Sequence, residues 1–194
     1  MIRRSGRRAR GRFPVRHDGG VYVVVTGPPA SGKSTLSRAI ADDLALPLLA
    51  KDTLKAALVE SLGAEDVAAS RRLGRAAVQA LLAVAREAGS GVLDSVWVDR
   101  ERARRELAGL GKPLVEVFCR CDVETMRGRY AGRASEGAGR FDLERREVEL
   151  WPEEALRPLA GPWPVVEVDT AERVDVHDVT RRMRDQGWGM MGHP

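Results

Sequence analysis

The feature that most constrains this chain is a nine-residue segment that begins with the eight-residue pattern G-x-x-x-x-G-K-[ST]. It follows Val21–Val25, a run of β-branched and aromatic residues that predicts a strand buried on both faces. Beyond it, apolar residues recur at a helical spacing through Leu44. A glycine-containing turn between a buried strand and a helix can direct its backbone N–H groups at phosphate oxygens. The segment consists of Gly27, Pro28, Pro29, Ala30, Ser31, Gly32, Lys33, Ser34 and Thr35.

The phosphate-binding chemistry of this segment uses each of its parts. Gly27 and Gly32 let the backbone turn inward, and the helix that starts behind them adds a partial positive charge. Lys33 supplies a cation for the β- and γ-phosphates, and the Ser34 hydroxyl completes the coordination of Mg²⁺. The motif therefore predicts binding of a purine nucleoside triphosphate, and we expect the ligands to be ATP and Mg²⁺.

The rest of the chain alternates short strand-like segments with helical ones. Because parallel strands are joined through right-handed crossovers, this alternation predicts a three-layer α/β sandwich with helices on both faces of a parallel sheet. The predicted strands are Val21–Val25, Leu46–Ala50, one within Gly91–Val98, Leu114–Cys119 and Val165–Val168. The predicted helices are Ser34–Leu44, Thr53–Ser61, Asp66–Ala88, Arg100–Leu110, Val123–Ala131 and Val174–Arg184.

Charge is distributed unevenly along the chain. Residues 1–16 hold seven arginines and no acid, so within a net charge of +4 the remaining residues carry −3. We expect residues 1–19 to form a basic, disordered tail, residues 20–187 a single domain and residues 188–194 a flexible end. Within the domain, a segment from about 130 to 163 is rich in Gly, Arg, Glu and Pro, and we expect it to form a lid.

Composition limits the environment of the protein. No apolar run approaches the ~20 residues of a membrane helix, so we expect no membrane span. Cys119 and Cys121 are the only cysteines, which suits a reducing compartment. We therefore expect a cytoplasmic protein.

Two aspartates end predicted strands near the motif. Since the carboxyl ends of parallel strands line the ligand crevice, Asp52 would face the γ-phosphate and could take the proton of an attacking hydroxyl. Its alternative role is to cap a helix beginning at Thr53. Asp94 could hold Mg²⁺ through water or bind an acceptor hydroxyl, and a turn or cap is its alternative. Trp97 follows, either as a wall of an acceptor pocket or as an ordinary packing residue.

Arginines gather after the fourth predicted strand. Arg129 and Arg133 are four residues apart on one helical face, with Arg127 beside them and Arg140 beyond. Bidentate arginines stabilise the charge that develops during phosphoryl transfer. The alternative is a solvated basic face, since most basic residues of this chain are arginines.

Two absences narrow the class of nucleotide-binding protein. The sequence contains no asparagine, which excludes the N-K-x-D motif of GTPase switches, and it lacks the L-S-G-G-Q segment of transporters. Small kinases, which pass the γ-phosphate to a bound acceptor, remain.

Four segments together resemble the small ATP-dependent kinases of the P-loop superfamily: Gly27–Thr35, Lys51-Asp52, Val92–Asp94 and Arg129–Arg133. The similar group, AAA_33, contains relatives of chloramphenicol phosphotransferase, polynucleotide 5′-kinase and gluconate kinase, and the resemblance spans about Val21 to Arg184. It implies the P-loop NTPase fold, with a five-stranded parallel sheet of order 2-3-1-4-5 and a lid after strand four.

The same resemblance implies roles for individual residues. Asp52 would be the base, and Arg129 and Arg133 would be lid arginines that contact the nucleotide. The lid here reads Ser135–Phe141, which departs from the more basic lids of the family. Arg129, Arg133 and Arg140 therefore all stay open as the phosphate-contacting arginine.

The resulting hypothesis is a phosphotransferase that moves the γ-phosphate of Mg·ATP to a hydroxyl of a small molecule such as an antibiotic, a nucleoside or a sugar. The predicted acceptor contacts are Asp52, Lys55, Asp94, Trp97 and Arg104. One alternative is a polynucleotide 5′-hydroxyl kinase, against which the −3 charge of the body counts. The other is an ATP-binding regulatory or toxin-like module with slow hydrolysis. Neither the identity of the acceptor nor the oligomeric state follows from the sequence.

Overall fold

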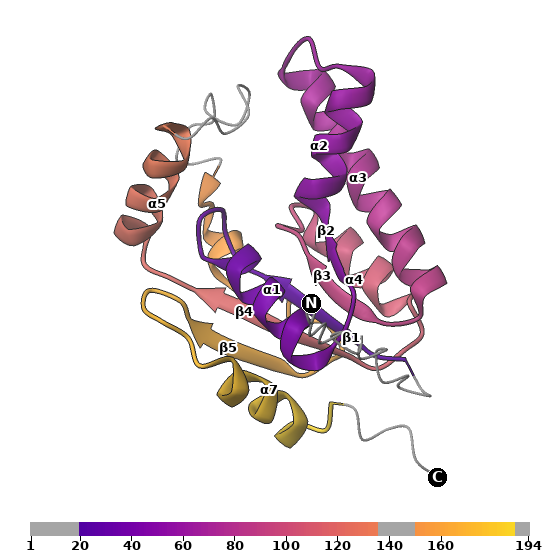
Figure 1. The fold of residues 1–194 in the computed structure, drawn as a ribbon, viewed down its shortest axis with the longest axis vertical. Helices are drawn as coiled ribbons and strands as arrows, with labels where there is room; N and C mark the ends of the chain where they lie inside the picture. The colour runs from indigo at the N-terminus through magenta and orange to yellow at the C-terminus, as the bar shows by residue number, and fades with distance from the viewer. Residues whose placement is uncertain (1–19, 136–149, 189–194) are drawn as a thin grey trace, which may run out of the picture.

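A computed structural model describes residues 20–135 and 150–188, except for the side chains of residues 133–135 (Figure 1). At its centre, β1 (Tyr22–Thr26) pairs in parallel with β3 (Gly91–Asp94) and β4 (Leu114–Arg120). The sheet is completed by β2 (Leu48–Ala50) beside β3 and β5 (Val165–Asp169) beside β4. The order β2-β3-β1-β4-β5 confirms the predicted fold class.

Helices cover both faces of this sheet. One face packs against α1 (Lys33–Leu44) and α7 (Val176–Asp185), and the other against α3 (Val67–Ala88) and α4 (Arg100–Ala108). The remaining helix α2 (Lys51–Leu62) lies along α3, and the two project together beyond the sheet (Figure 1). After β4 come α5 (Val123–Ser135) and a short 3₁₀ helix, η1 (Glu153–Leu156).

The alternation of side chains along β1 builds both halves of the core. Val23 and Val25 face α1 and α7, while Tyr22 and Val24 face α3 and α4. All four side chains are buried, which explains why this strand reads as a continuous apolar run. The Tyr22 hydroxyl donates a hydrogen bond of 2.6 Å to the carbonyl oxygen of Ala85 in α3, so its polar atom is satisfied inside the core.

Several boundaries differ from those predicted. Helix α2 begins at Lys51 rather than Thr53, directly at the end of β2. Strand β3, by contrast, stops at Asp94 as predicted, and three residues later Trp97 has a φ of 50°, which no extended strand accommodates. Residue 188 belongs to the folded body and not to a flexible end, because the Trp188 side chain is buried and its indole N–H donates to the carbonyl oxygen of Tyr22.

Part of the predicted lid lies outside the described residues. Helix α5 continues to Ser135, beyond the predicted end at Ala131. Residues 136–149, with Arg140, are not described, and neither are residues 1–19 and 189–194. None of the helices in the described ranges has the length and apolarity needed to cross a bilayer.

One buried carboxylate ties the segment after η1 to the central strand. Glu116 of β4 is fully buried, and its carboxylate accepts hydrogen bonds from four groups of the described residues. Its Oε1 accepts from the Thr26 hydroxyl and the Leu159 N–H, each at 2.6 Å. Its Oε2 accepts from the Ala160 N–H at 2.9 Å and the Trp163 indole N–H at 3.2 Å. Four donors satisfy the carboxylate and hold residues 159–163 against the residue that precedes the phosphate-binding turn.

We therefore expect Glu116→Gln to lower the free energy of unfolding by about 2–4 kcal/mol, because the new amide N–H₂ would face donors only. Denaturant unfolding followed by circular dichroism measures this change. Glu167→Gln is the matched control, since Glu167 is an exposed residue of β5. Equal stabilities of the two variants would contradict the role assigned to Glu116.

Candidate functional site

The turn between β1 and α1 has a backbone that depends on its glycines. Gly27 has a φ of +131°, and a Cβ there would lie 2.7 Å from the carbonyl oxygen of Cys119. Gly32 has a φ of +87°, and Ala30 is also left-handed at 63°. The contact at Gly27 admits no side chain, and the positive φ of Gly32 disfavours one, so both motif glycines have a steric reason. The turn wraps around the start of α1, as the motif predicts.

Residues far away in sequence hold this turn in place. The Thr170 hydroxyl, just after β5, donates to the carbonyl oxygen of Ser31 at 2.5 Å. The Trp151 indole N–H donates to the carbonyl oxygen of Pro29 at 3.0 Å. Trp151 also packs edge-to-face against Tyr130 of α5, with ring centroids 6.1 Å apart. The conformation of the turn is therefore supported both from the residue after β5 and from the described part of the predicted lid.

The polar groups of the turn suit a bound phosphate chain. Lys33 is 7% exposed, and its ammonium group donates to the carbonyl oxygen of Pro28 at 2.7 Å. The Ser31 hydroxyl oxygen is buried and has no hydrogen-bond partner among the described residues. A phosphate oxygen would satisfy it, and an unsatisfied buried hydroxyl otherwise costs about 1–3 kcal/mol. A buried cation and an orphaned hydroxyl in one glycine-shaped cradle fit an anion.

Asp94 and Ser34 meet at the end of β3. Asp94 pairs in register with Val25 of β1, and Ser34 lies near enough to its carboxylate to act on its pKa. Burial raises the pKa of Asp94 above its ordinary value, and the negative charge of Asp52 adds to this effect. Lys33 and Ser34 offset only part of the rise. A hydroxyl beside a carboxylate is an all-oxygen donor pair of the kind that Mg²⁺ prefers, so these residues fit that ion.

Asp52 lies in the first turn of α2, not at its N-cap, which is Ala50. Its carboxylate is 79% exposed and forms an ion pair of 2.8 Å with Lys51. Partial desolvation favours a higher pKa for Asp52, but Lys51, Lys33 and Lys55 together outweigh it and lower the pKa below its usual value. The capping alternative is therefore wrong for this residue. Asp52 therefore has an ionised carboxylate that interacts electrostatically with both Lys33 and Asp94.

Arg129 is the predicted lid arginine whose position the structure describes. Its guanidinium donates to the carbonyl oxygens of Thr170 and Ala171, each at 2.8 Å. One of its nitrogens lies 3.7 Å from the position that a Cβ on Gly32 would take, so Arg129 adjoins the cradle. Arg133 lies in α5, but its side chain is outside the described residues, as is Arg140. Arg127 is an exposed residue of the same helix.

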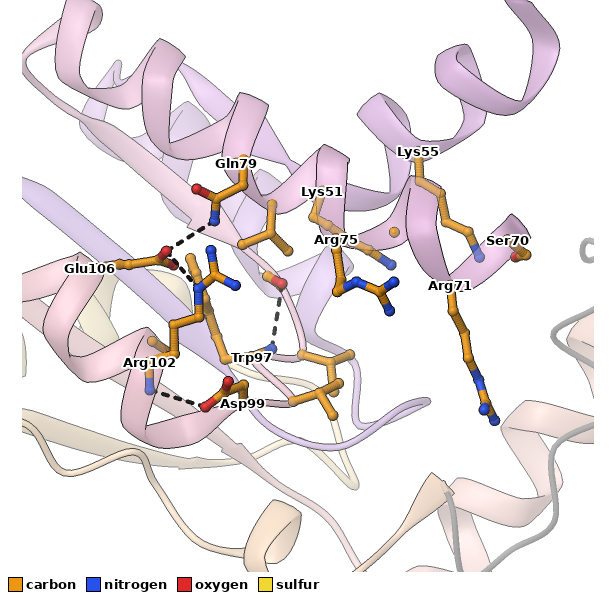
Figure 2. Close-up of a pocket in the computed structure, with 16 residues that line it drawn as sticks. Lys51, Lys55, Ser70, Arg71, Arg75, Gln79, Trp97, Asp99, Arg102 and Glu106 are labelled. Carbon is orange, nitrogen blue, oxygen red and sulfur yellow. Dashed lines mark hydrogen bonds and ion pairs between the residues drawn. The ribbon is translucent and has the colours of Figure 1, made fainter. Parts of the chain in front are cut away.

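Two larger cavities lie near the cradle, in addition to one of about 290 Å³ that Gly27, Pro29 and Trp97 help to line. The first, of about 600 Å³, lies beside the start of α1, and Gly32, Thr35, Arg129, Thr170 and Val174 contribute to its walls. The second, of about 440 Å³, lies between α2, α3 and α4 and the end of β3 (Figure 2). Both volumes fall in the ordinary range of small-molecule sites. The second cavity reaches Lys51 and Ser95, the neighbours of Asp52 and Asp94, and is the candidate acceptor pocket.

The structure brings some predicted acceptor contacts to this pocket and excludes another. Lys55 and Trp97 line it. Arg104 does not, because its guanidinium donates to the carbonyl oxygen of Leu159 at 2.7 Å and so supports the segment after η1. Arg104 thus supports the framework around the pocket, while Asp52 and Asp94 adjoin the pocket only through their neighbours Lys51 and Ser95. Arg100 is held in the same way by the carbonyl oxygens of Arg157 and Pro158.

Trp97 has two unusual properties for an aromatic residue. Its φ is 50°, a left-handed conformation that bulky side chains rarely adopt. Its side chain is buried, yet the indole N–H has no hydrogen-bond partner among the described residues. Strain and an orphaned polar group occur together at functional sites more often than elsewhere. Both observations favour a role for Trp97 as a wall of the acceptor pocket over simple packing.

Sequence reasoning missed the basic residues that α3 contributes to this pocket. Arg71 and Arg75 line it together with Val78 and Gln79. Positions 71, 75 and 78 share one helical face, so the spacing carried a signal. An arginine-rich helix face is normally solvated, however, and only the packing of α2 along α3 turns this one toward a cavity.

Sheet order, cradle and strand-end aspartates together define a kinase-like P-loop fold. A family model described as an AAA domain, AAA_33, matches residues 23–158. The chain belongs to this family. No match was found among curated protein sequences.

Solved structures agree with this assignment. An inferred kinase from Chloroflexus aurantiacus J-10-fl superposes with a TM-score of 0.74 at 28% identity, and the match covers 90% of this chain and 98% of the other. The APS kinase of Mycobacterium tuberculosis, solved with AMPPNP and APS, has a TM-score of 0.54 at 20% identity, covering 86% and 96%. Shikimate kinase from Bacteroides thetaiotaomicron has a TM-score of 0.52 at 15% identity, covering 85% and 97%. The last two likenesses concern the fold alone.

The cradle makes Lys33 a test of nucleotide binding. We expect Lys33→Ala to raise the Kd for ATP by about 10- to 100-fold, because a charge-assisted contact to phosphate is worth about 1.5–3 kcal/mol. Isothermal titration calorimetry measures the Kd. Lys112→Ala, which removes an exposed lysine ahead of β4, is the control. Unchanged affinity in the Lys33 variant would exclude the cradle as the phosphate site.

We expect Asp94 to destabilise the ligand-free protein and to contribute to Mg²⁺ binding. Since its pKa is raised by burial, the ionised carboxylate destabilises the folded state at pH 7, and Asp94→Asn should raise the Tm of the ligand-free protein. The advantage of the variant should shrink as pH falls through the raised pKa, because the folded wild type then takes up the proton. The same substitution should weaken the dependence of nucleotide affinity on Mg²⁺. A variant less stable than wild type at pH 7 would contradict this account.

Proposed function

We propose that the chain is an ATP-dependent phosphotransferase that moves the γ-phosphate of Mg·ATP to a hydroxyl of a small molecule. The proposal rests on one observation: the carboxyl ends of the neighbouring strands β1, β2 and β3 bring their functional residues to the same edge of the sheet. The cradle follows β1, Asp94 ends β3, and Asp52 follows β2, with a cavity of about 440 Å³ opening beside them. A hydrolase that transfers phosphate to water needs no acceptor cavity of this kind.

The two cavities supply separate places for the two substrates. The phosphate chain would lie over the backbone N–H groups of the turn and the Lys33 ammonium group. The cavity of about 600 Å³ would hold the nucleoside, since it adjoins Gly32 and Thr35. Arg129 forms part of its wall and would lie beside the phosphates. AMPPNP in the related M. tuberculosis APS kinase structure supports nucleotide use in this fold.

Chemistry would occur between Asp52 and the turn. The acceptor oxygen forms a bond to the γ-phosphorus, the bond from that phosphorus to the bridging oxygen of ADP breaks, and the hydroxyl proton passes to the Asp52 carboxylate. Because its pKa is lowered, Asp52 is a weak base that orients the hydroxyl and takes the proton late, as a loose transition state permits. Ser34 and Asp94 would hold Mg²⁺, which neutralises phosphate charge when bound.

The test is ADP release from Mg·ATP across hydroxyl compounds: antibiotics, nucleosides, sugars, hydroxy acids and 5′-hydroxyl oligonucleotides. Strong stimulation by a small molecule supports the proposal. Stimulation by the oligonucleotide instead would identify a polynucleotide kinase, and slow hydrolysis unaffected by every compound would favour the regulatory module.

Asp52→Asn should lower kcat with the stimulating acceptor by about 10²–10⁴-fold, because the amide cannot take the hydroxyl proton. The Kd for ATP should change little. Steady-state kinetics with coupled ADP detection measures kcat, and Asp42→Asn, at an exposed position of α1, serves as the control. Full turnover in the Asp52 variant would refute its role as base.

A further inference from the structure

We propose that the acceptor is an anionic, amphiphilic small molecule: an apolar or aromatic body that carries a carboxylate or phosphate group in addition to the hydroxyl that is phosphorylated. This inference rests on the proposed function, since it names the substrate class of the same site. It derives from the charge and the walls of the cavity between α2, α3 and α4 (Figure 2).

The cavity has an excess of positive charge. Five of the side chains that line it are basic and two are acidic. The basic residues are Lys51, Lys55, Arg71, Arg75 and Arg102, and the acidic ones are Asp99 and Glu106. This excess contrasts with the chain beyond its first 16 residues, which carries a net charge of −3. A local positive field in an acidic body selects for negative ligands.

The two acids are already engaged at the α4 side. Glu106 accepts from the Arg102 guanidinium at 2.8 Å and from the Gln79 amide at 3.0 Å. Asp99 caps α4 by accepting from the Arg102 backbone N–H at 3.1 Å. Neither of these bonds involves the basic residues that α2 and α3 contribute, and Figure 2 shows them across the pocket from Lys55, Arg71 and Arg75. Lys51 is paired with Asp52, and Lys55, Arg71 and Arg75 complete the basic side of the cavity on α2 and α3.

Arg75 is the most direct candidate for contact with the anionic group. It lies one helical turn after Arg71 on the same face of α3. Its guanidinium makes no hydrogen bond or ion pair with any residue in the described ranges. A guanidinium fork matches a planar carboxylate or a phosphate bidentately, which gives geometry as well as charge.

Apolar side chains also line the cavity. Val78 and Trp97 line it, and Val98, which is 85% exposed, stands at its edge. Exposed apolar side chains next to a cavity favour a ligand with an apolar body. The orphaned indole N–H of Trp97 adds a donor that lacks a partner in the described part of the chain.

The reactive hydroxyl would lie at the far end of the ligand. Lys51 and Ser95 line the cavity and directly adjoin Asp52 and Asp94 in sequence. With the anionic group at Arg75, the opposite end of the ligand approaches the transferred phosphate. The cavity volume of about 440 Å³ suits a compound between a monosaccharide and a nucleotide in size.

A pair of fluorescent probes tests the pocket without any assumption about turnover. The anionic probe is 8-anilino-1-naphthalenesulfonate, and its neutral counterpart is N-phenyl-1-naphthylamine, which lacks only the sulfonate. Each is titrated into the full-length protein with saturating Mg·AMPPNP, so that the nucleotide site is blocked. We expect saturable binding of the anionic probe, with a Kd at least about tenfold lower than that of the neutral one.

Arg75→Gln should raise the Kd of the anionic probe by about three- to tenfold and leave that of the neutral probe unchanged. Arg72→Gln is the matched control, since Arg72 is an exposed residue of the same helix that does not line the cavity. Equal affinity for the two probes, no saturable binding of the anionic probe, or equal effects of the two substitutions would each overturn the inference.

Measurements of turnover then distinguish a failure of this inference from a failure of the proposed function. ADP release is compared for shikimate against its methyl ester and for ribose 5-phosphate against ribose. A preference for the charged compound of one pair, lost in Arg75→Gln, supports both the anionic acceptor and the proposed function. The pair that shows the preference tells whether the anionic group is a carboxylate or a phosphate. Strong turnover of neutral acceptors, unaffected by Arg75→Gln, overturns the anionic class and leaves the kinase. Selective binding of the anionic probe in a protein that no acceptor stimulates supports the anion site and overturns the phosphotransferase.

Discussion

The structure depends on the close approach of the β1–α1 turn to the end of β4. Gly27 lies so near the Cys119 carbonyl oxygen that no Cβ fits between them. This approach lets the backbone curl tightly enough for Lys33 and the start of α1 to face one small volume. The same closeness lets Thr170, at the end of β5, reach the Ser31 carbonyl oxygen. Three strands thus hold the cradle, and its shape is preorganised for phosphate before any ligand binds.

The site concentrates groups that are unfavourable for folding. A carboxylate with a raised pKa, a buried ammonium group, a hydroxyl that has no partner among the described residues and a strained tryptophan all lie at the same end of the sheet. Each costs stability in the ligand-free protein, and each would gain a partner from a phosphate, a metal ion or an acceptor. Elsewhere, comparable groups are satisfied: Glu116 accepts from four donors, and the Tyr22 hydroxyl has its own acceptor. The contrast separates the functional end of the molecule from the rest of the core.

The segment 151–159, which contains η1, links the two sides of the site. Trp151 holds it to the phosphate-binding turn, while Arg100 and Arg104 hold it to α4. Trp97 lines both the candidate acceptor pocket and the smaller cavity beside the turn. The residues that the sequence predicted to contact the acceptor therefore fall into two groups. Some, such as Lys55, line the pocket, whereas Arg104 supports the framework around it.

The sequence by itself determined the cradle, the alternation of strands and helices and, with the family resemblance, the sheet order. These depend on local sterics and on apolar periodicity, which a single chain displays directly. Tertiary structure alone decided which charged residues meet at a site. Arg75 and Arg104 have similar surroundings in sequence, yet the packing of α2 along α3 turns one toward a cavity, and a backbone carbonyl binds the other. Glu116 lies in an apolar strand, and its four donors come from β1 and from residues 159–163. Contacts between segments so far apart leave no local pattern, because the direction of a long polar side chain depends on what packs beside it.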